Sequence, residues 1–157
     1  MKIECWAIGK PHELYVADGV KDFTKRIGNY FPIEWQLFNL KKNAAPLSPG
    51  KLKEEEKQLI LSALKTDDWL VSLDEKGKSM NSRKLASFIQ DRGNDSVRRL
   101  IFLIGGAYGL DESILERSKL IWSLSELTFP HQLVRLILAE QIYRACSIVR
   151  NEKYHHD

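Results

Sequence analysis

The sequence predicts an α/β fold in which helices flank a mostly parallel sheet. Short apolar runs that are typical of strands alternate along the chain with longer segments of helical periodicity. These runs are apolar at most positions, as in strands buried on both faces of a parallel sheet. The 157 residues show no internal repeat or linker, so one domain covering residues 1–157 is expected.

The first half of the chain alternates three strands with two helices. A proline and a Gly-Asn pair bound the first helix, whose apolar residues Leu14, Val16, Val20, Phe23 and Ile27 recur at helical spacing. His12, at its start, is expected on the surface. Charged residues 51–56 are expected on a solvated helix face. The expected elements are strands at 3–9, 33–40 and 69–74, helices at 12–30 and 51–65, and a loop at 41–50.

The second half continues the alternation after an expected turn at residues 75–78. Ser82 and Asp111 are the expected N-caps of the next two helices. Before the last helix, Phe129 precedes a proline and is expected to be extended, with Thr128 as a cap and Pro130 in the first turn. The expected elements are helices at 83–92, 112–118 and 130–151, and strands at 100–104 and 120–124.

Composition excludes several classes of protein. Apolar residues make up 43% of the chain and charged residues 29%, as in soluble globular proteins. No apolar run approaches the roughly 20 residues that span a bilayer, and no signal peptide is recognisable. Cys5 and Cys146 lack the C-x-x-C spacing of metal or redox sites, so buried free thiols in a cytoplasmic protein are expected. A net charge of +3 is compatible with an anionic partner without indicating one.

Three of the predicted strands end in segments suited to ligand binding. In open α/β sheets, ligands bind at the carboxyl ends of the strands. Leu73 ends one strand, a Gly-Gly-Ala-Tyr-Gly turn begins at Gly105, and residues 124–129 follow another strand. Glycines in such a turn let backbone approach a ligand closely. Without a ligand, Leu73 would be an ordinary core leucine and the glycines an ordinary tight turn between strand and helix. The glycines do not have the G-x-G-x-x-G spacing of dinucleotide-binding proteins, which argues against a nicotinamide cofactor.

The last helix places two charged groups on opposite faces. Glu140 and Arg144 have the i, i+4 spacing of a surface ion pair. Arg135 lies on the apolar stripe, one turn after His131, where a charge is costly unless it is compensated. The sequence leaves two interpretations of Arg135 open, namely a buried salt bridge and a place in a functional site. The polar tail carries two adjacent histidines without the further ligands of a metal site.

Three segments resemble the ribosomal RNA large-subunit methyltransferase H family of the SPOUT, or α/β-knot, superfamily. They are residues 130–135 (Pro-His-Gln-Leu-Val-Arg), residues 140–145 (Glu-Gln-Ile-Tyr-Arg-Ala), and the Tyr-His pair at 154–155. The resemblance implies a C-terminal trefoil knot and a homodimer whose active sites are each completed by the neighbouring chain. It implies methylation of N3 of a pseudouridine in 23S ribosomal RNA, on the ribosome, with S-adenosylmethionine as cofactor and no metal or membrane partner.

The same resemblance assigns site residues. Four catalytic residues are expected. Arg135 would stabilise the negative charge that develops on the acceptor base, and His131 or His155 would take up the proton that the base loses. Tyr154 would stack on a base of the RNA. The expected cofactor-binding residues are Leu73, Gly105, Leu124, Ser125, Glu126, Leu127, Thr128 and Phe129. Candidate RNA contacts are Lys41, Lys42, Arg144, Arg150 and Lys153. A non-catalytic ribosome-binding module and a nucleotide-binding metabolic enzyme are the alternatives.

Overall fold

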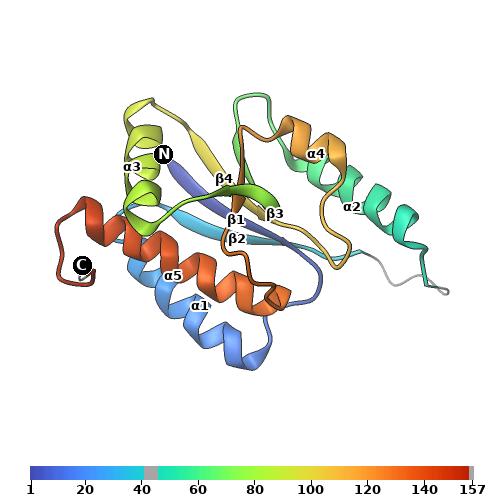
Figure 1. The fold of residues 1–157 in the computed structure, drawn as a ribbon, viewed down its shortest axis with the longest axis horizontal. Coiled ribbons are helices and arrows are strands. Elements are labelled where there is room, and N and C mark those ends of the chain that lie inside the picture. The colour runs from blue at the N-terminus through green and yellow to red at the C-terminus, as the bar shows by residue number, and fades with distance from the viewer. Residues whose placement is uncertain (41–45, 156–157) are drawn as a thin grey trace.

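A computed structural model describes residues 1–40 and 46–155 of the chain (Figure 1). Strands and helices alternate throughout the described residues, as the sequence predicts. The strands are β1 Lys2–Ile8, β2 Ile33–Phe38, β3 Trp69–Ser79, β4 Arg99–Ile104 and β5 Leu120–Ser123. The helices are α1 Leu14–Ile27, α2 Pro49–Ala63, α3 Ser82–Asn94, α4 Glu112–Arg117 and α5 His131–Val149.

The five strands form one parallel sheet in the order β2-β1-β4-β3-β5. All carboxyl ends of the strands therefore lie at the same edge, where parallel sheets bind ligands. The predicted fold class, a parallel sheet flanked by helices, is confirmed. The trefoil knot stays a prediction of the resemblance.

Each face of the sheet packs against its own set of helices (Figure 1). Side chains alternate between the faces along β1, because successive residues of a strand point to opposite sides. Cys5 and Ala7 join the core beneath α1, α3 and α5, whereas Trp6 and Ile8 join the core beneath α2 and α4. Both faces of the central strands are therefore buried, which explains their nearly uninterrupted apolar runs.

Strand β3 is longer than the sequence predicts. The expected strand ended at Asp74, and residues 75–78 were expected to form a turn, but pairing continues to Ser79. Trp122 of β5 is a register partner of both Leu73 and Lys78, with an irregularity between them. Between these pairs, a Cβ atom on Gly77 would lie 2.7 Å from the backbone of β5. A glycine is therefore needed at position 77 because β3 and β5 approach each other closely there, and not because the chain turns.

The cap expected at Ser82 is displaced by one residue. Asn81 is the N-cap of α3, and its side chain accepts a hydrogen bond of 2.9 Å from the backbone N–H of Lys84. An asparagine carbonyl oxygen caps as well as a serine hydroxyl, so the neighbouring polar residue takes the role. The Ser82 hydroxyl donates instead to Gln141 of α5 at 2.9 Å and ties the two helices together.

Burial differs from the expectation at three residues. Leu14 begins α1, which starts two residues later than predicted, and its side chain is 91% exposed. His12, expected on the surface, is half-buried against Trp35 with ring centroids 5.2 Å apart. Glu56, expected on the solvated face of α2, is buried. By contrast, both cysteines are buried free thiols as expected, and burial raises the pKa of Cys146 to about 12.

Candidate active site

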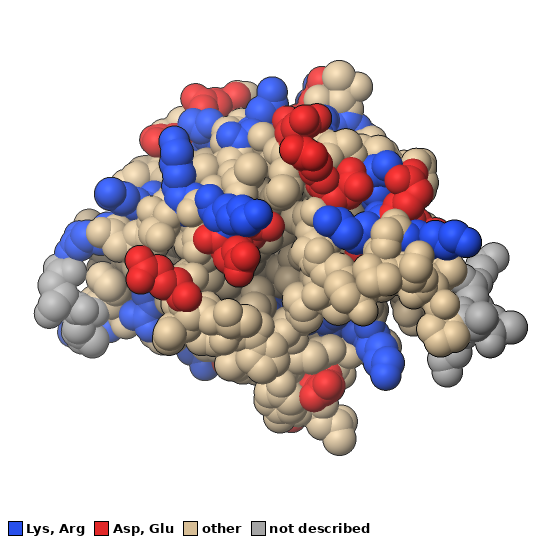
Figure 2. Space-filling model, turned by 45° about the vertical axis from the view of Figure 1, so that its right-hand side comes forward, with Lys and Arg blue, Asp and Glu red and all other residues tan. Residues whose placement is uncertain are grey.

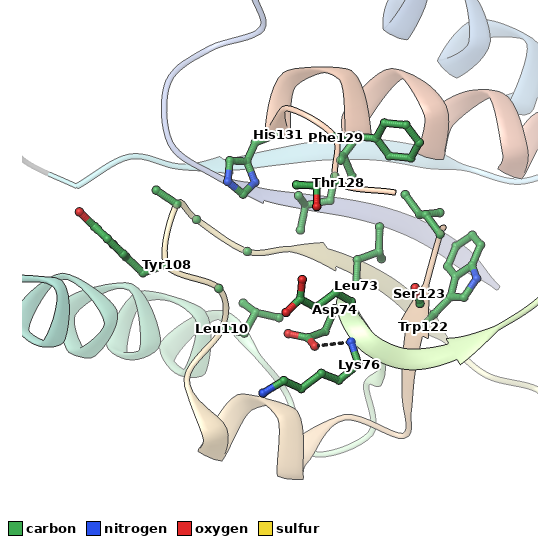
Figure 3. Close-up of a pocket in the computed structure, with 18 of the residues that line it drawn as sticks. Leu73, Asp74, Lys76, Tyr108, Leu110, Trp122, Ser123, Thr128, Phe129 and His131 are labelled. Atoms are coloured by element: carbon green, nitrogen blue, oxygen red, sulfur yellow. Dashed lines mark hydrogen bonds between the residues drawn. The ribbon is translucent and has the colours of Figure 1, made fainter. Parts of the chain in front are cut away.

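An open cavity of about 910 Å³ lies at the carboxyl ends of β4 and β5 and beside the irregular part of β3 (Figure 3). Its walls come from residues 73–76, 104–110 and 122–129, so segments of three neighbouring strands and the loops that follow two of them converge on it. The volume is in the range of sites that enclose a small organic ligand. All eight predicted cofactor residues line this cavity: Leu73, Gly105, Leu124, Ser125, Glu126, Leu127, Thr128 and Phe129.

The glycine turn after β4 forms one wall. The N–H of Gly109 donates to the carbonyl of Gly106 at 3.1 Å, and Gly109 has a φ of +74°, which favours glycine. A Cβ atom on Gly105 would lie 3.0 Å from Cγ of Leu110 and 3.3 Å from the Gly109 carbonyl carbon. The packing of the turn on itself therefore leaves little room for a side chain at Gly105.

The segment between β5 and α5 forms a second wall. The backbone N–H of Leu127 donates to the Ser125 hydroxyl at 3.0 Å, which holds this segment in a compact turn. Leu127 is 71% exposed, so it contributes less apolar wall than expected. Thr128 is not the helix cap, because α5 begins at His131 with Pro130 as its N-cap residue. In Figure 3 the Thr128 side chain lies at the cavity, across from Leu73 and Asp74.

The lining of the cavity carries more acidic than basic side chains. The basic residues are Lys53 and Lys76, and the acidic residues are Asp74, Glu75, Glu112 and Glu126. Asp74 is fixed in place by the backbone N–H of Lys76, which donates to its carboxylate at 2.9 Å. On the face drawn in Figure 2, charges of both signs are interspersed around a hollow. Of these charged residues the prediction included only Glu126, although acids at strand ends are a recognisable signal.

His131 and Arg135 have different surroundings although they lie one turn apart. His131 lines the cavity, and Figure 3 shows its ring directed towards the glycine turn. Arg135 does not line the cavity and is 1% exposed. It donates to the backbone carbonyls of Lys10 at 2.8 Å and Ile8 at 3.2 Å. Carbonyl groups at the end of β1 therefore compensate the guanidinium, whose pKa is lowered by burial.

The start of α5 is also joined to the loop after β1. Gln132 accepts from the backbone N–H of Glu13 at 3.1 Å and donates to the carbonyl of Pro11 at 3.1 Å. Nδ1 of His12 lies 3.4 Å from Nη1 of Arg135, and burial followed by the Arg135 charge lowers the pKa of His12. Sequence reasoning missed this connection, because it joins residues more than a hundred positions apart.

The predicted residues of the tail lie at the other end of α5. The Tyr154 hydroxyl donates to Glu140 at 3.1 Å, and the guanidinium of Arg144 lies 4.8 Å from the centroid of the Tyr154 ring. Nδ1 of His155 lies 3.4 Å from Nη1 of Arg144. His131 and Arg144 are about 20 Å apart along the helix, from a rise of ~1.5 Å per residue. One chain therefore brings His131, but neither Tyr154 nor His155, to the cavity.

Two further features are absent from the described residues. Within residues 1–40 and 46–155, no group of three or more His, Cys, Asp or Glu side chains is arranged to hold a metal ion. None of the helices in the same ranges is long and apolar enough to cross a membrane.

Comparison with known proteins identifies the family. A family model described as "Predicted SPOUT methyltransferase" matches residues 1–155. A protein of Cytophaga hutchinsonii named "Ribosomal RNA large subunit methyltransferase H" is 43% identical, covering 99% of this chain and 100% of the relative. Proteins of the same name from Parabacteroides distasonis and Carboxydothermus hydrogenoformans are 40% and 38% identical, each covering at least 99% of both chains.

A solved structure agrees with the fold. A chain from a study of "the 2-OH methylation of C/U34 on tRNA" superposes with a TM-score of 0.50 at 15% identity. The match covers 93% of this chain and 97% of the solved one. Together with the full-length sequence matches, these findings mean that the chain belongs to the SPOUT methyltransferase family, in the group of the ribosomal RNA large subunit methyltransferase H proteins.

Proposed function

We propose that this protein transfers the methyl group of S-adenosylmethionine to N3 of a pseudouridine in 23S ribosomal RNA. The observation that carries the proposal is the convergence of all eight predicted cofactor residues, from three separate segments of the chain, on one cavity. Relatives that are 38–43% identical over nearly their whole length are named ribosomal RNA large subunit methyltransferases. The catalytic interpretation is therefore preferred to a non-catalytic binding module.

The chemistry of the cavity suits this cofactor. Leu73, Ile104 and Leu124 provide apolar surface for an adenine ring, and the glycine turn offers backbone groups for hydrogen bonds. The excess of acidic side chains favours a ligand that carries a sulfonium and an ammonium group. S-adenosylmethionine supplies an activated methyl group, so the protein has only to align the acceptor nitrogen and help it lose a proton.

Among the four candidate catalytic residues, His131 is our preferred group for the proton. It lines the cavity, and an imidazole ring can accept a proton from a nearby acceptor base. Arg135 remains a candidate for stabilising the negative charge that develops on the acceptor. Its charge is buried beneath the start of α5, so this effect would act over a distance rather than by contact.

Tyr154 and His155 enter the proposal through a second copy of the chain. Both lie at the far end of α5 from the cavity of their own chain. A homodimer that places one tail against the neighbouring cavity brings these residues to the acceptor base. Tyr154 would stack on the base and His155 would contact phosphate or accept the proton.

RNA binding would follow from basic side chains near the same tail. Arg144, Arg150 and Lys153 are the proposed phosphate contacts within the described residues, whereas Lys41 and Lys42 lie outside them. The substrate we propose is the large subunit within the assembled ribosome, which places the protein in the cytoplasm. Phosphate contacts release counterions, so the affinity should fall steadily as salt is raised.

Calorimetry and single-turnover methylation test the proposal together. S-adenosylmethionine should bind, whereas a nicotinamide dinucleotide should not, and methyl transfer to ribosomes from cells lacking the protein should map to one pseudouridine. Binding of the cofactor without transfer to any ribosomal particle would favour the non-catalytic module. Absence of cofactor binding would refute the proposed function.

A further inference from the structure

Helix α2 carries a buried acid that the proposed chemistry does not use. Glu56 is 6% exposed, whereas the neighbouring Glu55 is exposed. The other buried acids, Glu4 and Asp68, both pair with Arg99. Glu56 has no hydrogen bond or ion pair with any of the described residues, and burial raises its pKa although the charge of Lys53 acts in the opposite direction. An acid in this condition costs stability, so its place in the structure calls for another explanation.

The carboxyl group of Glu56 lies directly against Gly106 of the glycine turn. A Cβ atom on Gly106 would be 2.6 Å from Oε1, 2.9 Å from Oε2 and 3.1 Å from Cδ of Glu56. The positive-φ glycines among the described residues are Gly9 and Gly109, so the backbone of Gly106 would accept an L-residue. A methyl group at Gly106 would therefore have to displace the Glu56 carboxyl group, whereas the backbone itself would accept it.

This contact lies behind a wall of the cavity. Gly106 lines the cavity, whereas Glu56 does not. The carbonyl of Gly106 also closes the turn by accepting from the N–H of Gly109. Ile60, one helical turn after Glu56, is 1% exposed in the core beneath α2. Glu56 thus extends the buried stripe of α2 as far as the cavity wall.

We propose that Glu56 is a positioning residue that holds the glycine turn in the conformation needed to bind the methyl donor. Its planar carboxyl group fills the space behind Gly106 and stops the turn from moving away from the cavity. The inference rests on the proposed function for the identity of the ligand. The contact itself rests on the geometry of α2 and the turn alone.

Titration of S-adenosylmethionine into five variants tests this role. Glu56→Ala should weaken binding about tenfold, a typical coupling for residues in contact, and Glu56→Gln, which keeps the shape, should stay within about twofold. Gly106→Ala should weaken binding about tenfold in the native background but less than about twofold when Glu56→Ala removes the obstructing group. Glu55→Ala, on the exposed face of the same helix, is the matched control and should bind normally.

Kinetics and unfolding complete the test. The KM for S-adenosylmethionine should rise in Glu56→Ala while kcat at saturating cofactor is retained, a split that general destabilisation would not give. If Gly106→Ala does not fold, folding should be recovered when Glu56→Ala is added, and this recovery would reveal the contact between Gly106 and the Glu56 carboxyl group. Additive effects of the two changes, or a Gln variant as weak as Ala, would overturn the inference while wild-type binding upholds the proposed function. Absence of wild-type binding would remove both.

Discussion

Replacing Arg135 by alanine distinguishes an anchor from a catalytic charge. The structure gives the guanidinium two backbone acceptors, the carbonyls of Ile8 and Lys10, at the end of β1. Removing the side chain leaves these carbonyls without their partner, at a cost of ~1–3 kcal/mol each. Relief of the burial of an unpaired charge offsets part of this cost. We therefore expect the free energy of unfolding to fall by about 2–4 kcal/mol.

Such a loss is measurable without abolishing the fold. Domains have stabilities of about 5–15 kcal/mol, so most Arg135→Ala molecules should remain folded at 25 °C. For a chain of this size the expected decrease in Tm is roughly 4–16 °C. Denaturant unfolding gives the stability, and single-turnover methylation at 25 °C gives the chemistry on the folded fraction. Arg135→Met, which keeps the aliphatic stem, is the matched control for lost packing.

The anchoring role and the catalytic role of Arg135 predict different results for stability and methylation. If Arg135 is an anchor, stability falls and single-turnover methylation by the folded protein is largely retained. If its charge stabilises the acceptor, turnover falls about a hundredfold to a thousandfold, and raising the pH restores part of it because more acceptor is deprotonated. An Arg135→Ala protein that unfolds at the wild-type denaturant concentration would refute the anchoring role.

Four further changes test other parts of the structure. Gly77→Ala should lower the free energy of unfolding by about 2 kcal/mol or more, because the new Cβ atom meets the backbone of β5. Gly50→Ala, where a Cβ atom has open space around it, is the control and should leave the free energy of unfolding nearly unchanged in the same denaturant assay. The stability of Glu56→Gln relative to the wild type should increase as pH rises from about 4.5. The pKa of Glu56 is raised in the folded protein, so the unfolded chain releases this proton at lower pH than the folded chain does, and the wild type loses stability as pH rises. A difference in unfolding free energy that is the same at every pH would contradict this. Gly105→Val should abolish binding of S-adenosylmethionine in calorimetry by distorting the glycine turn, and a folded variant with normal affinity would remove Gly105 from the site. Arg150→Ala should reduce the slope of log affinity for ribosomes against log salt by about one, whereas an unchanged slope would exclude a phosphate contact.

Local patterns predicted the elements and much of the cavity. Alternating apolar runs and helical periodicity are properties of neighbouring residues, so the strands and helices could be recognised in order. The carboxyl ends of parallel strands meet at one edge, and the family resemblance selected Leu73 and Gly105 as partners of residues 124–129 there. These predictions needed no knowledge of which strand pairs with which.

The errors come from contacts between distant segments. Residues 75–79 continue β3 only because β5 offers them pairing partners. The acceptors of Arg135 are carbonyls, which every residue possesses, so no side-chain pattern could reveal them. Glu56 stands in a run of three glutamates, and only the packing of α2 against Gly106 distinguishes it from its exposed neighbours.

The strand order also constrains how the chain folds. The first strand, β1, lies inside the sheet between β2 and β4, and Lys2 pairs with Arg99. During synthesis β1 must therefore wait for nearly two-thirds of the chain before its second neighbour exists. Parallel pairing at such sequence separation slows folding and leaves an apolar strand edge open in the meantime. Until β4 is made, the nascent N-terminal half therefore exposes an apolar strand edge that favours aggregation.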